Sequence, residues 1–248
     1  MTNALCISIE LMKDAIIATL VGNNPTIYLY GSIVHDDFKL GASDIDIIVL
    51  TEYEITEVQA NALVKLRQTM LAQYPSNPYF RLFEGGMLST DAFLQGKNER
   101  TVYWGTSGQR ITDSYNLDSF AVVELLERGI LLCGGDIRAK MQPPSYTQMR
   151  DEIRQHVQTA RLHGKTTGWL LDIARGIYTL RTGKVIPKTA AGEWAIKNNL
   201  CPNADAMYKA VEIRKTPQAH PNRDMDASII QQFCDVIDAE FDKGDLPQ

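Results

Sequence analysis

Hydrophobic residues recur with two different periods in the first part of the chain. In residues 4–21 and 54–74 they return every three or four positions, which predicts two amphipathic helices, each followed by a segment that contains proline. Residues 26–30 and 44–50 are rich in β-branched and aromatic side chains, which predicts two strands. Residues 79–84 alternate in a way that predicts a third strand. The pattern therefore favours a mixed α/β region.

The pattern changes at a pair of prolines, residues 143 and 144. Before the pair, residues 118–128 are expected to form a helix and residues 129–133 a strand, whereas residues 98–117 have a weak pattern and are expected to form a loop. After the pair, helical periodicity dominates, and helices are expected at 146–163, 168–181, 188–199, 204–215 and 225–241. We therefore expect an α/β (α+β) domain with a mixed sheet over residues 1–142 and an all-α helical bundle over residues 143–248.

The overall composition is typical of a soluble globular protein, with 44% hydrophobic and 22% charged residues. The net charge is −5 and no basic cluster is seen, which argues against a nucleic-acid partner and fits a cationic small molecule better. The four cysteines are far apart, so neither a zinc site nor a disulfide framework is indicated. No signal-peptide pattern or bilayer-length apolar stretch is seen, so we expect a cytoplasmic protein without a membrane partner, as a monomer or a small homo-oligomer.

The residues with the most distinctive chemistry surround the first two predicted strands. Gly31 and Ser32 follow the first strand, where a residue without a Cβ lets the backbone approach a phosphate group closely. In the second strand, side-chain alternation puts Asp44 and Asp46 on one face. Two neighbouring carboxylates repel each other unless a cation lies between them, and Mg²⁺ binds carboxylates together with triphosphate oxygens. With Ser43 as a further phosphate contact, the pattern predicts metal-assisted nucleotidyl or phosphoryl transfer; an ordinary turn and an exposed strand face are the alternative.

Two segments carry a resemblance to a known superfamily. Residues 29–32, Leu-Tyr-Gly-Ser, and residues 43–49, Ser-Asp-Ile-Asp-Ile-Ile-Val, resemble the signature of the DNA polymerase beta-like nucleotidyltransferases. The resemblance implies that Asp44 and Asp46 hold Mg²⁺ and that a glutamate in the third strand removes the proton of the acceptor hydroxyl group. Glu84 matches that glutamate and is also a candidate third metal ligand. An edge-strand glutamate that faces water is the alternative interpretation of Glu84.

A second, narrower resemblance lies in the predicted helical bundle. Residues 171–196 are similar to the C-terminal domain of the aminoglycoside (3'')(9)-adenylyltransferases, which modify streptomycin and spectinomycin. In that family the domain closes over ATP, so the resemblance implies that Arg175 and Lys188 contact the triphosphate. A guanidinium group grips phosphate oxygens in a fork, and an ammonium group supplies a point charge. An ion pair of Arg175 with Asp172, and simple exposure of Lys188, are the alternatives.

The residues expected to contact the acceptor match the related enzymes less well than the residues expected to bind ATP. Tyr103 and Trp104 are expected to form an exposed aromatic pair in a loop, and Trp104 is a candidate substrate contact because the related enzymes have a tryptophan in this general region. The relatives carry an acidic Asp-Glu-Arg-Asn stretch where residues 165–168 here read Lys-Thr-Thr-Gly. A family tyrosine near the nucleotide has no clear counterpart in residues 211–217.

The combined prediction is a Mg²⁺-dependent enzyme that transfers AMP from ATP to a hydroxyl group of a small cationic acceptor, with an aminoglycoside or aminocyclitol antibiotic as the first choice. The nearest alternative is the same transfer to a lincosamide, a metabolite or a protein. A second alternative is a non-catalytic nucleotide-binding or antitoxin-like module. Two mutually repelling carboxylates argue against that module, because a protein that only binds nucleotide does not need them.

Overall fold

The chain divides into two compact units. The structure is a computed structural model that describes residues 1–105 and 108–243. The first unit contains residues 1–38 and 43–143, and the second contains residues 39–42 together with the chain from residue 144 onward. Residues 39–42, the last four before the second sequence motif of the first unit, therefore belong with the second unit, which the hydrophobic pattern did not indicate.

The first unit is built on a mixed β-sheet with the strand order β5-β4-β3-β2-β1-β6 among the described residues. Strands β2 and β3 are parallel, and the other neighbouring pairs are antiparallel. The strands are β1 (Thr26–Leu29), β2 (Ile45–Thr51), β3 (Phe83–Ser89), β4 (Thr101–Gly105), β5 (Gly108–Thr112) and β6 (Ile130–Cys133).

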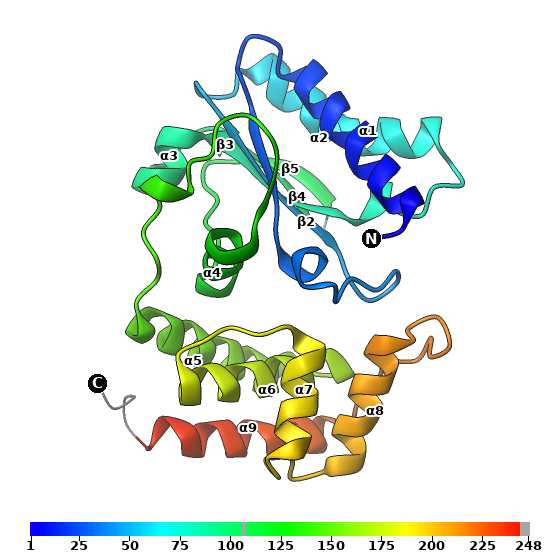
Figure 1. Ribbon diagram of the computed structural model, residues 1–248, viewed down its shortest axis with the longest axis vertical. Coiled ribbons are helices and arrows are strands. Elements are labelled where there is room, and N and C mark those ends of the chain that lie inside the picture. Colours follow the sequence, from blue (N-terminus) through cyan, green and yellow to red (C-terminus); the bar gives the residue numbers. More distant parts are fainter. Residues whose placement is uncertain (106–107, 244–248) are drawn as a thin grey trace. The chain divides into compact units, whose positions relative to one another are not determined.

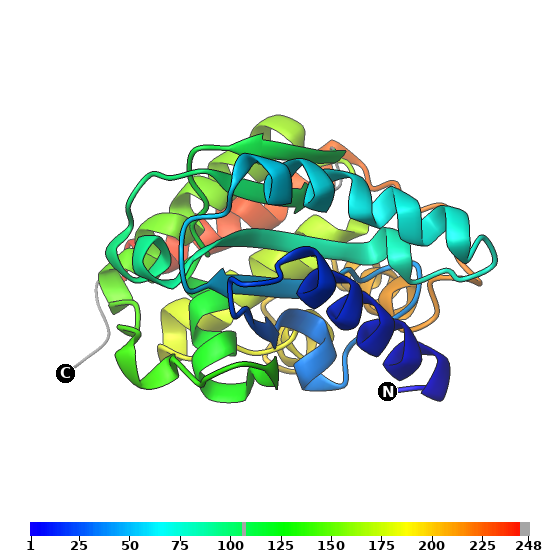
Figure 2. The same ribbon diagram turned by 90° about the horizontal axis from the view of Figure 1, so that it is seen from above.

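Helices cover both faces of this sheet (Figure 1). Helices α1 (Asn3–Thr19) and α2 (Glu57–Gln73) pack on one face, and α3 (Thr90–Gln95) and α4 (Ser119–Arg128) pack on the other. Figure 2 shows α1 and α2 from above, where both lie over the strands. Because both faces are covered, β2 is an almost unbroken apolar run, with Ile47 in the core under α1 and α2 and Ile48 in the core under α3 and α4.

One predicted strand begins at the wrong residue, and one predicted loop contains strands. Residues 80–82 of the predicted third strand form a short 3₁₀ segment, η2 (Phe80–Leu82), and β3 begins only at Phe83. The strand then continues through Gly85, where a Cβ would lie 1.7 Å from the carbonyl oxygen of Ile47, so the close approach of β2 and β3 requires glycine there. Residues 98–117 are not a loop, because they contain β4 and β5; residues 106–107 of the predicted loop lie outside the described residues.

The second unit is helical, as predicted. Its helices are α5 (Tyr146–His163), α6 (Thr167–Thr182), α7 (Lys188–Lys197), α8 (Ala204–Lys215) and α9 (Ala227–Phe241). Helix α6 contacts the other four. Gly176 of α6 permits this packing, since a Cβ there would lie 2.8 Å from Ile237 and 3.0 Å from Ile153. The predicted fold class, an α/β domain followed by helices, is confirmed.

Residues 39–42 are attached to the helical unit through their carbonyl groups. The side chain of Arg214 donates a hydrogen bond of 3.0 Å to the carbonyl oxygen of Ala42, and the side chain of Arg223 donates to that of Gly41. Across the described chain, no helix is both long enough and apolar enough to span a membrane.

Candidate active site

The turn that follows β1 is shaped around the carboxylate of Asp46. The 3₁₀ segment η1 (Gly31–His35) begins at Gly31, whose φ is +70°. A Cβ at Gly31 would lie 2.0 Å from Oδ2 of Asp46, so both the backbone angle and the available space require glycine. The N–H of Tyr30 donates to the carbonyl oxygen of Asp46 at 3.1 Å and ties the end of β1 to β2. The Asp46 carboxylate therefore lies directly against the Gly31-Ser32 turn.

The hydroxyl group of Ser32 is available to a ligand. Its Oγ is buried and has no hydrogen-bond partner among the residues that the structure describes. Leaving a buried hydroxyl group unpaired costs on the order of 1–3 kcal/mol, so such a group is expected to meet a bound molecule. The backbone of the turn is held by the N–H of Asp37, which donates to the carbonyl oxygen of Ser32 at 3.1 Å. Nε2 of His35, 3.6 Å from Oε1 of Glu124 in α4, is a second buried polar atom without a hydrogen-bond partner among the described residues. The turn therefore offers a polar atom on a fixed backbone.

Carboxylates from two adjacent parallel strands meet at this end of the sheet. Asp44 immediately precedes β2, Asp46 lies within it, and the parallel register places Asp46 opposite Glu84 of β3. Burial raises the pKa of the Glu84 carboxyl group; Asp44 raises it further, while the hydrogen bond from Tyr103 and the charge of Arg67 lower it, and the net shift is upward. Within residues 1–105 and 108–243, no group of three or more His, Cys, Asp or Glu side chains is arranged to hold a metal ion. The roles of Asp44, Asp46 and Glu84 as metal ligands stay predictions.

Two residues next to Glu84 were not predicted from the sequence as part of the site. The Tyr103 hydroxyl group donates a hydrogen bond of 2.9 Å to Oε1 of Glu84. The buried Arg67 donates to the carbonyl oxygens of Phe83 at 2.7 Å and Gly105 at 3.0 Å, and so joins β3 to β4 beside Glu84. A signal for Arg67 exists in the sequence, because it occupies an apolar position of the helical repeat in α2, where a buried charge is unusual.

The prediction that Trp104 is exposed in a loop is wrong, and its predicted contact with substrate rested on that exposure. Trp104 lies in β4, is fully buried in the core under α1 and α2, and its indole N–H donates to the carbonyl oxygen of Leu63 at 3.0 Å. Alternation along β4 turns Tyr103 to the opposite face, toward Glu84. The aromatic side chain next to the site is therefore Tyr103, one position earlier in the chain.

In the helical unit, the two predicted phosphate contacts gather around one buried carboxylate. Nζ of Lys188 lies 2.9 Å from Oδ1 of Asp172, and the Arg175 guanidinium lies 3.8 Å from the same oxygen. Burial alone raises the pKa of Asp172, but the charges of Lys188, Arg175 and His156 bring it below its ordinary value. The ion pair of Arg175 with Asp172, the alternative considered from sequence, is thus present. The role of both basic residues at a triphosphate stays a prediction.

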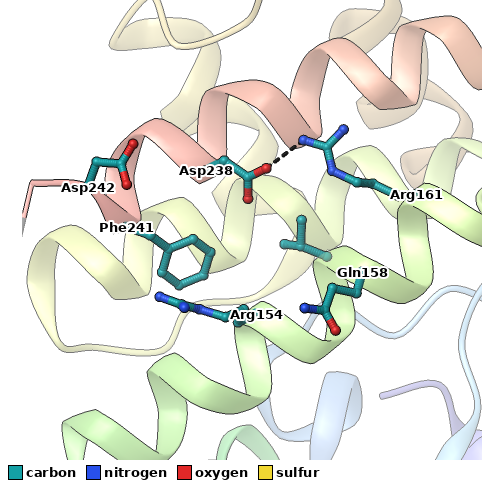
Figure 3. A pocket seen from close by; sticks show the side chains of 7 residues that line it. Arg154, Gln158, Arg161, Asp238, Phe241 and Asp242 are labelled. Carbon is teal, nitrogen blue, oxygen red and sulfur yellow. Dashed lines mark hydrogen bonds and ion pairs between the residues drawn. The ribbon is translucent and has the colours of Figure 1, made fainter.

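A pocket of about 270 Å³ lies between α5 and α9 (Figure 3). Three of its charged side chains have partners within the pocket: Arg161 lies 2.6 Å from Asp238, and the Arg154 guanidinium lies 4.7 Å from the ring centroid of Phe241. None of the site residues predicted from sequence lines it. The pocket is lined by Arg154, Val157, Gln158, Arg161, Asp238, Phe241 and Asp242.

Comparisons with known proteins point to one kind of relative. The family model described as the C-terminal domain of aminoglycoside adenylyltransferase matches residues 141–240. Spectinomycin 9-adenylyltransferases of Staphylococcus aureus strains Mu50 and N315 are each 22% identical over 201 residues, which cover 76% of this chain and 75% of theirs. A crystal structure of the spectinomycin adenyltransferase AAD(9) from Enterococcus faecialis with ATP and spectinomycin matches with a TM-score of 0.65 and 14% identity, over 93% of this chain and 98% of that one. The resemblance inferred from residues 171–196 is confirmed.

Proposed function

We propose that this protein is a Mg²⁺-dependent adenylyltransferase that transfers AMP from ATP to a hydroxyl group of a small cationic acceptor of the aminoglycoside or aminocyclitol type. The observation that carries the proposal is the meeting of three features at one end of the sheet. These are the Gly31-Ser32 turn with its unpaired buried hydroxyl group, the Asp46 carboxylate against that turn, and Glu84 opposite Asp46 in register. Similarity to spectinomycin 9-adenylyltransferases supports the choice of nucleotide and acceptor class.

The residues present fit a magnesium-bound triphosphate. Mg²⁺ is commonly held by one or two carboxylates plus substrate phosphates, which suits Asp44 and Asp46, with Glu84 as the candidate third ligand. Ser32 and Ser43 would donate hydrogen bonds to phosphate oxygens. When bound, Mg²⁺ supplies charge neutralisation and polarises the phosphate group under attack. Arg175 and Lys188 are proposed to bind further triphosphate oxygens, on the strength of the family match over residues 141–240.

Glu84 is the proposed general base. It accepts the proton of the acceptor hydroxyl group while the acceptor oxygen forms a bond to the α-phosphorus and the bond from that phosphorus to pyrophosphate breaks. A half-buried carboxylate with a raised pKa is a better proton acceptor than an exposed one, because its charged form is less stabilised by water. The rest of the protein's contribution is to hold the reacting groups in line.

One observation favours a different acceptor as the second candidate. Lys165 is exposed at the start of residues 165–168, where the resemblance to the aminoglycoside adenylyltransferases implies an acidic stretch. A positive charge at that position disfavours a polycationic acceptor by repulsion. A less basic acceptor, such as a lincosamide or a metabolite with a free hydroxyl group, is therefore the alternative substrate for the same reaction.

The proposal is tested by pyrophosphate release from Mg-ATP. Purified protein is incubated with spectinomycin, streptomycin, other aminoglycosides and lincosamides in turn, with Asp46→Asn as the blank and mass spectrometry of the acceptor to detect the added AMP. Release with one compound, absent from the blank, supports the proposal and identifies the acceptor. Release only with a lincosamide favours the second candidate. No release with any compound, although the protein binds ATP, would refute the antibiotic-acceptor proposal.

A further inference from the structure

Tyr103 is positioned on the face of the sheet that carries the candidate active site. It lies in β4, directly opposite Gly86 of β3. Residues opposite each other in an antiparallel pair share a face, and residues two apart on a strand share it as well, so Tyr103 and Glu84 are diagonal neighbours. The hydrogen bond of 2.9 Å between the tyrosine hydroxyl group and Oε1 of Glu84 follows from this register.

Two glycines provide the space in which Tyr103 reaches Glu84. A Cβ at Gly105 would lie 2.4 Å from the hydroxyl oxygen of Tyr103 and 2.5 Å from its Cε1, so the ring lies along the strand over Gly105. A Cβ at Gly86 would lie 2.1 Å from Cδ1 of Tyr115, whose ring is the neighbour of the Tyr103 ring. Any side chain at either glycine would displace one of the two rings. The absence of side chains at these two glycines therefore gives both tyrosine rings the space that they occupy.

Two neighbouring side chains, Arg110 and Tyr115, also contact the Tyr103 ring. The guanidinium carbon of Arg110 lies 4.5 Å from its ring centroid, and the Tyr115 ring centroid lies 5.7 Å away. These contacts hold the ring in the position in which its hydroxyl group bonds to Glu84.

We infer that Tyr103 is a positioning residue for the proposed reaction, whose hydroxyl group holds one oxygen of Glu84 so that the other oxygen is presented to the acceptor hydroxyl group. This inference rests on the proposed function of Glu84. In the step concerned, the acceptor O–H proton moves to Oε2 of Glu84, the oxygen electron pair forms the bond to the α-phosphorus, and pyrophosphate leaves with the electrons of the broken P–O bond. Tyr103 keeps its own proton and restricts the rotation of the carboxylate, which removes unproductive orientations.

The first test is the substitution Tyr103→Phe in the full chain. It keeps the ring, its stacking on Tyr115 and its contact with Arg110, and it removes only the hydrogen-bond donor. We expect kcat to fall about tenfold, the low end of what is lost when a partner that orients a functional group is removed, while the KM for ATP changes less than about twofold. Tyr115→Phe is the matched control, because it removes a hydroxyl group from the same cluster but no bond to Glu84, and its kcat is expected to stay within about twofold of wild type.

The second test is a double-mutant cycle with Glu84→Ala. If Tyr103 acts through Glu84, Tyr103→Phe lowers the residual rate of Glu84→Ala by less than about twofold, whereas a general structural role would lower it by the same factor as in wild type. The wild type, the two single variants and the double variant are also unfolded in urea. Their midpoints measure the coupling between the two side chains without any need for enzyme activity. Here we expect Tyr103→Phe to shift the midpoint less in the Glu84→Ala background than in the wild type.

The outcomes separate the inference from the proposed function. Equal losses of kcat in Tyr103→Phe and Tyr115→Phe, or independent effects of Tyr103→Phe and Glu84→Ala in the kinetic cycle, would overturn the inference. If the wild-type protein has no transferase activity with any acceptor, the proposed function fails, and with it the positioning role. In that case the urea cycle still reports on the Tyr103–Glu84 bond, and additive midpoint shifts would show that the bond itself is absent in solution.

Discussion

Replacing Gly31 with alanine should damage the candidate active site far more than it damages the fold. The backbone φ of +70° at Gly31 costs a non-glycine residue about 1–2 kcal/mol. The added Cβ would also lie 2.0 Å from Oδ2 of Asp46, which is well inside van der Waals contact, so either the turn or the carboxylate must move. Because catalytic geometry must be kept within about 0.5 Å, this movement should lower kcat by at least about a hundredfold.

Gly22 provides a matched control in the same unit. Its φ is +82°, close to that of Gly31, but a Cβ there would have nothing within 4 Å. Gly22→Ala should therefore carry the backbone cost of about 1–2 kcal/mol alone and leave activity unchanged. Urea unfolding followed by circular dichroism gives the stability of both variants, and pyrophosphate release gives their activity. If Gly31→Ala were no less active than Gly22→Ala, the close contact between the turn and Asp46 would have no part in function.

Three further predictions concern other parts of the chain. Asp46→Asn should reduce pyrophosphate release by several orders of magnitude, as should removal of Mg²⁺ with EDTA, and near-normal turnover in either case would contradict the metal assignment. Trp104→Ala should destabilise the first unit by about 3–5 kcal/mol in urea, because it empties a fully buried site; a stable variant with a raised KM for the acceptor would instead restore the substrate role. The bond from Arg181 lowers the pKa of Glu240 below 4.5, so this pair should stabilise the helical unit above about pH 4.5 and lose that effect as the pH falls through the lowered pKa. The difference in urea midpoint between wild type and Glu240→Gln, measured from pH 3 to pH 7, should shrink toward the acid end, and a constant difference would contradict the shift.

Elements whose contacts are local were well predicted from the sequence. Each helix of the second unit was expected at nearly its observed position, because helical periodicity and capping residues are read within a few neighbouring positions. Ser145, for example, caps α5 by accepting a hydrogen bond from the N–H of Gln148. The Gly31-Ser32 turn and the Asp44 and Asp46 pair were also visible, since they occupy short motifs on either side of a single connection.

The sheet edge was poorly predicted because its strands depend on distant partners. Strands β4 and β5 have a weak hydrophobic pattern. Strand β5 has no neighbour on its outer side among the described strands, and none of its residues is buried. Whether Trp104 or Tyr103 faces the candidate site depends on the register of β4 against β3. A shift of one residue exchanges the two faces, and no local signal in residues 98–117 determines it.

The sequence by itself determined the helices of the second unit, the class of fold and the residue types that suit nucleotidyl transfer, because each of these depends on residues close together in the chain. Only the tertiary structure decided which side chains meet. The bond from Tyr103 to Glu84, the bridge of Arg67 between β3 and β4, and the attachment of residues 39–42 to the helical unit all join positions that are far apart in sequence. Such contacts depend on strand register and on which faces pack together, and these are properties of the whole folded unit rather than of any one segment.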